Sequence, residues 1–99
     1  MAIRIQRSSG NVFADMGFPR EEAAHLLIRA DLMIQVTALI KERGLTQRQA
    51  AKALNVTQPR ISDLVRGRIE LFSIDTLVEM LSRLGIAVML KTKRRSRVA

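Results

Sequence analysis

The sequence of 99 residues predicts a small, mainly helical domain that ends in a short strand. Apolar residues make up 47% of the chain, which is enough for a core, and over several stretches they recur at helical spacing. Residues that start or stop helices bound each of these stretches. Cysteine is absent, so the chain offers no disulfide, no thiolate metal site and no cysteine nucleophile. His25 is the single histidine, so the chain cannot build a metal site from several histidines.

We expect one domain with three parts: an irregular N-terminal segment at 1–17, a helical part at 18–85, and a strand with a basic tail at 86–99. Near the N-terminus, Ile3 and Ile5 alternate with polar residues, which is a weak strand signal. No uninterrupted apolar run approaches the 18–20 residues or so of a membrane span, and the N-terminus lacks the form of a signal peptide. We therefore expect a cytoplasmic, nucleoid-associated protein that does not contact a membrane.

A long helix is predicted first, starting at Pro19 with Glu21 and Glu22 behind it and ending before Gly44. This helix has two apolar sides, and the second, with Leu27 and Ile34, lies almost opposite the first on the helical wheel. Such a helix either packs on two sides within one monomer or has a partner, and both interpretations stay open. The first apolar face carries Ile28, Leu32, Val36, Leu39 and Ile40.

Three short helices follow. Residues 46–49 form a capping box that begins a helix reaching about residue 54. Thr57 can cap the next helix, which carries Pro59 in its first turn and ends near Arg66. Ser73 caps the last helix, which ends before Gly85. The apolar stretch 86–90 is predicted as a strand, whose partner is residues 3–6, the same strand of a second subunit, or another protein.

The segment 46–66 has the composition of a helix-turn-helix. Ala51 is small enough for two helices to cross closely, and Asn55 tolerates the left-handed conformation of a sharp turn. Ile61, Leu64 and Val65 are expected on the buried side of the second helix. The spacing of four residues and then six between Ala51, Asn55 and Ile61 fixes the relative pose of the two helices.

The charge favours a polyanionic partner, because the chain carries a net +8. Five of these charges lie in the last nine residues and are typical of a solubilising tail. Within 44–68, however, five cations face Asp63 alone, a local net charge of +4. The basic helix-turn-helix therefore predicts a DNA-binding protein, and the open alternative is a protein-interaction module without an operator of its own.

The motif resembles the lambda-repressor/Cro-like, or XRE, helix-turn-helix family over about residues 31–85, with Gln47, Ala51, Asn55, Ile61 and Leu64 in the motif positions. The stretches 11–17, 42–47, 57–62, 66–68 and 72–75 look more narrowly like small HigA-type antitoxins. That resemblance implies a lambda-repressor-like bundle and an antitoxin that represses its own operon and neutralises a RelE/HigB-like ribonuclease toxin. A stand-alone phage-type repressor is the alternative within the family.

In such motifs the second helix enters the major groove, with its N-terminal end leading. Asp63 either accepts a hydrogen bond from cytosine or orients Arg60 and Arg66. Candidate base contacts are Gln58, Pro59, Arg60, Ser62, Asp63 and Arg66. Candidate phosphate contacts are Thr46, Gln47, Arg48, Lys52, Thr57 and Arg68.

One recognition helix reads only a few base pairs, so we expect a homodimer on a palindromic operator. The dimer contact is expected in the helix at 73–84 or in the strand, through Ile86, Val88, Met89 and Leu90. For a toxin, the unused surfaces are 1–17 and the side of the long helix that carries Leu27 and Ile34. No catalytic residues, metal site or cofactor are predicted, so we do not expect an enzyme.

Overall fold

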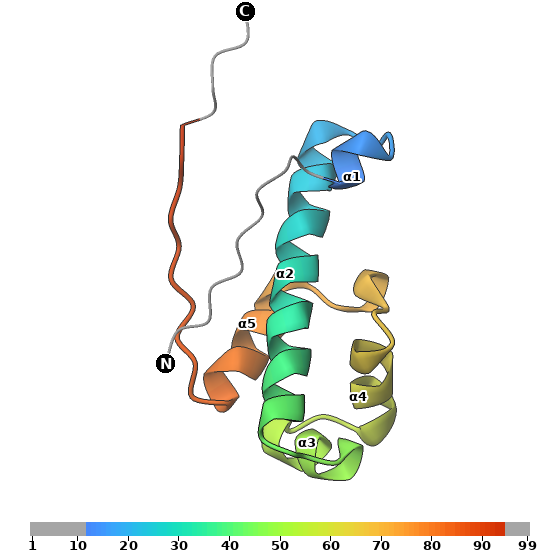
Figure 1. Ribbon diagram of the computed structural model, residues 1–99, viewed down its shortest axis with the longest axis vertical. Helices are drawn as coiled ribbons and strands as arrows, with labels where there is room; N and C mark the ends of the chain where they lie inside the picture. Colours follow the sequence, from blue (N-terminus) through green and yellow to red (C-terminus); the bar gives the residue numbers. More distant parts are fainter. Residues whose placement is uncertain (1–11, 95–99) are drawn as a thin grey trace, which may run out of the picture.

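Residues 12–94 are described by the structure, a computed structural model, and they fold around one long central helix (Figure 1). The predicted mainly helical class is confirmed. The weak strand signal at Ile3 and Ile5, and the tail beyond Arg94, lie outside the described residues. In order, the elements are α1 (Val12–Asp15), α2 (Arg20–Glu42), α3 (Gln47–Leu54), α4 (Gln58–Val65), the 3-10 helix η1 (Ile69–Leu71) and α5 (Ile74–Arg83).

The core lies between the C-terminal half of α2 and the shorter helices. α2 packs against α5, η1 and α4, while α3 packs against α4 and α5. Ile28 was expected on the core face of α2 but is 47% exposed, because the core begins at Leu32 and the N-terminal half of α2 extends beyond it toward α1 (Figure 1). Side chains of this core include Leu32, Val36, Leu39, Ala51, Leu54, Ile61, Leu64, Phe72, Leu77 and Leu81.

The second apolar side of α2 is not covered within the described residues. Leu27 is half-buried, and Ile34 is 49% exposed. The interpretation in which both sides of the helix pack fully inside one monomer therefore fails at Ile34. This side of α2 is left as a surface on which another molecule can pack.

By length and composition alone, α2 is long and apolar enough to cross a membrane. This was not expected, because the sequence contains no uninterrupted apolar run of that length. It has 23 residues and a mean hydropathy of 1.5 over an 18-residue window, of which 39% is buried in the fold. Core helices of globular proteins meet the same criterion. Seven residues of α2 are buried, most of them against the other helices, so the core accounts for much of this hydropathy.

The predicted helix ends are largely confirmed. Thr46 Oγ1 accepts from the Gln49 N–H at 3.1 Å, and the Gln49 side chain accepts from the Thr46 N–H at 2.9 Å, which completes the capping box. Ser73 Oγ accepts from the Thr76 N–H at 3.1 Å and caps α5. Thr57 stands at the N-cap of α4 but its side chain makes no capping bond.

The predicted strand at 86–90 does not form within the described residues. No segment among residues 12–94 pairs with it, and the chain after α5 runs beside α2 without regular structure (Figure 1). Ile86 is buried and donates its N–H to Leu81 O at 2.9 Å, closing the end of α5. Val88 packs on the core, whereas Met89 and Leu90 are 83% and 92% exposed. An apolar stretch becomes a strand only where a neighbouring backbone can bond to it.

Two short helices were not predicted. The segment 1–17, expected to be irregular, contains α1. The ring of Phe13 in α1 meets the ring of Phe18, which follows this helix, edge-on with centroids 6.1 Å apart. η1 bridges α4 and α5. Helices of three or four residues depend on such contacts, because nucleating a helical turn is unfavourable by itself.

Candidate nucleic-acid interface

The turn between α3 and α4 adopts the geometry that the motif requires. Asn55 has φ 56° and ψ 46°, the left-handed conformation, and Val56 N–H donates to Ala51 O at 2.9 Å. Ala51 is buried where the two helices meet, and Ile61 and Leu64 bury the inner side of α4. The predicted helix-turn-helix is therefore confirmed, with Asn55 holding the angle between its helices.

The outer side of α4 faces away from this core. Gln58 and Pro59, in its first turn, are exposed, and so is Arg66 just after its end, while Ser62 and Asp63 are half-buried. Val65 was expected to be buried but is 45% exposed. α4 meets the core along Ile61 and Leu64, so Val65 is rotated to the rim of that contact. No ion pair joins Asp63 to either neighbouring arginine among the described residues.

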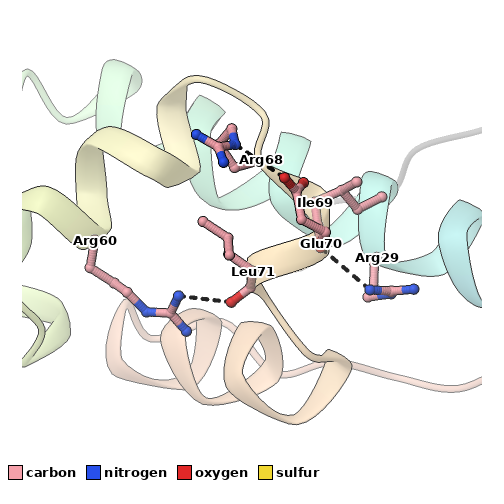
Figure 2. Close-up of polar contacts among 6 residues, drawn as sticks. All are labelled: Arg29, Arg60, Arg68, Ile69, Glu70 and Leu71. Atoms are coloured by element: carbon pink, nitrogen blue, oxygen red, sulfur yellow. Dashed lines mark hydrogen bonds and ion pairs between the residues drawn. The ribbon is translucent and has the colours of Figure 1, made fainter.

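Arg60, a base-contact candidate, is held against the protein's own surface. Its Nη1 donates to Leu71 O at 2.7 Å, and its guanidinium carbon lies 4.2 Å from the centroid of the Phe72 ring (Figure 2 draws the hydrogen bond). The side chain is half-buried and turned toward η1. It does not project freely with Gln58 and Arg66.

Arg68 is partly neutralised by Glu70. Its Nε donates to Glu70 Oε2 at 3.1 Å across the surface of η1 (Figure 2). The backbone hydrogen bond that the Glu70 carboxylate accepts at its own residue, together with this bond from Arg68, holds the pKa of Glu70 below its ordinary value. The carboxylate is therefore charged at neutral pH and competes with any phosphate for Arg68.

Of the five cations in 44–68, three are exposed and have no internal partner among the described residues: Arg48, Lys52 and Arg66. Arg48 and Lys52 lie on α3, and Arg66 follows α4. Among the other phosphate-contact candidates, Gln47 and Thr57 are exposed and Thr46 is occupied by its capping box. Of the cations that give 44–68 its net charge of +4, three are therefore free to contact DNA.

Sequence reasoning missed two structural arginines, Arg29 on α2 and Arg43 at the C-cap of this helix. Arg43 Nη2 donates to Leu84 O at 2.7 Å and closes the end of α5, and Arg29 Nη1 donates to Ile69 O at 3.4 Å on η1. The partners lie 41 and 40 residues away in the chain. No local pattern signals such bonds, so these cations looked like ordinary surface charge.

The described residues contain no group of three His, Asp or Glu side chains placed to hold a metal ion. Away from the helix-turn-helix, an apolar groove of about 720 Å³ lies between α2 and the segment after α5. It is lined by residues that include Ile28, Leu32, Gln35, Ile86, Val88 and Leu90.

Comparisons with known proteins agree with this geometry. A family model described as a helix-turn-helix domain matches residues 12–93. A solved structure assigned to the XRE family of transcriptional regulators is 31% identical to this chain, with a TM-score of 0.70, and the match covers 79% of this chain and 90% of that one. A search of curated proteins finds no match.

Proposed function

This chain belongs to the XRE family of helix-turn-helix transcription regulators, and we propose from that membership that it binds double-stranded DNA in a sequence-specific way and represses transcription. The family is a type of transcription regulator and not a class of enzyme. The observation that carries the proposal is the exposed first turn of α4, which the Asn55 turn presents beside a basic α3. In this family of motifs, that turn enters the major groove.

Base reading is assigned to the exposed residues of α4. Gln58 leads the helix, and its amide can pair with the N6 and N7 atoms of adenine. Arg66 can reach guanine or a phosphate from the other end of α4, and Pro59 offers an apolar contact. Ser62 and Asp63, half-buried, are secondary candidates.

Backbone contacts are assigned to the neighbouring cations and helix ends. Arg48 and Lys52 on α3 are free to neutralise phosphates. Gln47 and Thr57 stand where the free N–H groups of α3 and α4 suit a phosphate oxygen. Thr46 can contact a phosphate only by giving up its capping box, which uses both its N–H and its hydroxyl. Arg68 can join them only by leaving Glu70.

We assign the dimer contact to the segment 86–90 and the groove beside it. The two-fold symmetry of a palindromic operator requires a second copy, with recognition helices about 34 Å apart. Met89 and Leu90 are almost fully exposed, and the backbone at 86–90 has no strand partner within residues 12–94. A second copy supplies an identical segment, which can pair with this one and fill the groove.

The resemblance to HigA-type proteins supports an antitoxin role, in which the chain represses its own operon and binds a RelE/HigB-like ribonuclease toxin in the cytoplasm. The exposed side chains of Val12, Met16 and Ile34 give such a partner an apolar surface away from α4. The same surface would serve a bridging module, so DNA binding decides between the two functions.

The test is a gel shift with the DNA directly upstream of this chain's own coding sequence, at moderate salt, competed with random DNA. We expect the upstream fragment to survive an excess of random competitor of about 100-fold. Equal competition by random DNA would refute the repressor and favour the bridging module. Co-purification with the product of the adjacent gene tests the antitoxin role separately.

Variants of two exposed residues distinguish the proposed contacts. Gln58→Ala should reduce affinity for the upstream fragment about tenfold and leave affinity for random DNA nearly unchanged. Lys52→Ala should weaken binding to both DNAs alike and lower the slope of log K against log salt by about one. Fluorescence anisotropy over a salt series measures both quantities, and identical behaviour of the two variants contradicts the assignment.

A further inference from the structure

We propose that Arg60 is a positioning residue that fixes α4 against η1 and α5, and that it does not read a base itself. The inference rests on the proposed DNA binding and concerns how the recognition helix is held. It reassigns the arginine that the sequence alone makes a natural candidate for guanine.

The contacts of Arg60 use both properties of a guanidinium group. Its carbon lies 4.2 Å from the centroid of the Phe72 ring, and its Nη1 donates to Leu71 O at 2.7 Å. Phe72 is 1% exposed and belongs to the core. One side chain therefore connects the first turn of α4 to the hydrophobic core.

η1, the second half of this connection, is held from the opposite side as well. Arg29 of α2 donates to Ile69 O at 3.4 Å, so two carbonyls of η1 accept bonds from arginines on two different helices (Figure 2). Arg29 Nε is buried without a hydrogen-bond partner, so the bond from Nη1 to Ile69 O is the polar contact that holds this guanidinium group on η1. α2, η1 and α4 thus form one connected unit.

Such a tie matters because α4 is short. Its eight residues bury only Ile61 and Leu64, a narrow contact about which the helix can tilt. Hydrogen bonds to base edges require donor–acceptor distances of about 3 Å, so a small tilt removes discrimination while leaving phosphate attraction in place. Arg60 sits in the same turn as Gln58, where a tilt would move the reading residue most.

If Arg60 instead turned to DNA, it would give up the Phe72 ring and leave Leu71 O without this donor. Arg66, exposed and without an internal partner in the described residues, makes that exchange unnecessary.

The experiment compares Arg60→Gln, Phe72→Leu and the double variant, with Arg66→Gln as the matched control. Phe72 is buried, so it can affect DNA reading only through the protein. Binding is measured by anisotropy on the upstream fragment and on a scrambled duplex, across a salt series, after thermal melts have shown that each variant is folded.

Arg60→Gln and Phe72→Leu should each lower the ratio of specific to non-specific affinity by about tenfold, and the double variant by no more than either. The salt slope of Arg60→Gln should equal that of the wild type, whereas that of Arg66→Gln should fall by about one. Two results would overturn the proposal. In the first, Arg60→Gln lowers the salt slope. In the second, Arg60→Gln loses the preference for one particular base pair while Phe72→Leu keeps that preference.

Amide chemical shifts of the free protein test the tie without DNA. Arg60→Gln should move the α4 and η1 resonances and Arg66→Gln should not; equal, local changes in both would also overturn the proposal. A wild type that fails to discriminate the upstream fragment refutes the proposed function instead, while these free-protein shifts still decide whether Arg60 positions α4.

Discussion

Asn55 is the residue on which the pose of the recognition helix depends. It is the one non-glycine residue with positive φ in the part of the chain that the structure describes. Asparagine adopts this left-handed conformation more readily than other residues that carry a side chain. The sequence identified both the residue and its conformation, because a two-helix motif of this spacing leaves no other position for the turn.

Asn55→Ala should lower the free energy of unfolding by about 1 kcal/mol, because alanine has no local hydrogen bond to offset the left-handed conformation. Asn55→Gly should leave stability within about 0.5 kcal/mol of the wild type. Urea unfolding followed by circular dichroism measures both. A larger loss for glycine than for alanine would contradict this account of the turn.

The arginines show that one residue type has three different roles here. Arg29, Arg43 and Arg60 donate to backbone carbonyls of the same chain, and Arg68 pairs with Glu70. Arg48 and Arg66 are exposed and free of such bonds. Net charge estimated from the sequence therefore overstates the charge available to DNA.

Glu70→Gln should raise affinity for DNA and steepen the salt slope by about one, because it releases Arg68 to a phosphate. Glu79→Gln is the matched control, since Glu79 pairs with Arg83 on α5 at 3.6 Å. Anisotropy over a salt series measures the slope. An unchanged slope in Glu70→Gln would show that Arg68 takes no part in binding.

Acid should act on the same pair. The pKa of Glu70 is lower in the folded chain than its ordinary value, so the pair stabilises the fold above the ordinary carboxyl pKa and loses this contribution as pH falls through the folded pKa. The pair is exposed, so its effect on stability is small and its effect on charge near α4 is the more informative one.

At the scale of elements, helix ends were the most predictable feature. The capping box at Thr46 and the cap at Ser73 were both read from residue identity, because capping involves neighbours three residues apart. Elements that depend on distant contacts were not predictable: α1, η1 and the path of the chain after α5.

The two threonine N-caps give a matched pair. Thr46→Ala removes the bond to Gln49 N–H and should cost about 1 kcal/mol of stability. Thr57→Ala removes a side chain that makes no capping bond and should cost markedly less. Chemical unfolding of the two variants side by side checks the difference, and equal losses would show that the structure misassigns one of the caps.

At the scale of the whole molecule, the surfaces used for different tasks are separate. The exposed turn of α4 and the cations of α3 serve DNA in our proposal, while the groove between α2 and residues 86–91 serves a second copy. Separation of this kind lets a dimer form without covering the recognition helices.

Met89→Lys with Leu90→Lys should shift the protein from dimer to monomer at micromolar concentration, because each substitution places a charge in an apolar contact. Both side chains are exposed in the monomer, so the melting temperature of the monomer should not fall. Met16→Lys, at another exposed methionine, is the control. Light scattering coupled to gel filtration measures the mass; a wild-type monomer, or a double variant that remains dimeric, would exclude this interface.

The sequence by itself determined the helices α2 to α5, the caps at Thr46 and Ser73, the Asn55 turn and the buried Ile61 and Leu64, because all of these depend on residues within one or two helical turns. Only the tertiary structure decided that Arg60 faces Phe72, that Val65 and Ile28 are exposed, and that 86–90 forms no strand within residues 12–94. Each of these depends on which distant segment lies opposite, and neither side-chain type nor spacing along the chain specifies that neighbour.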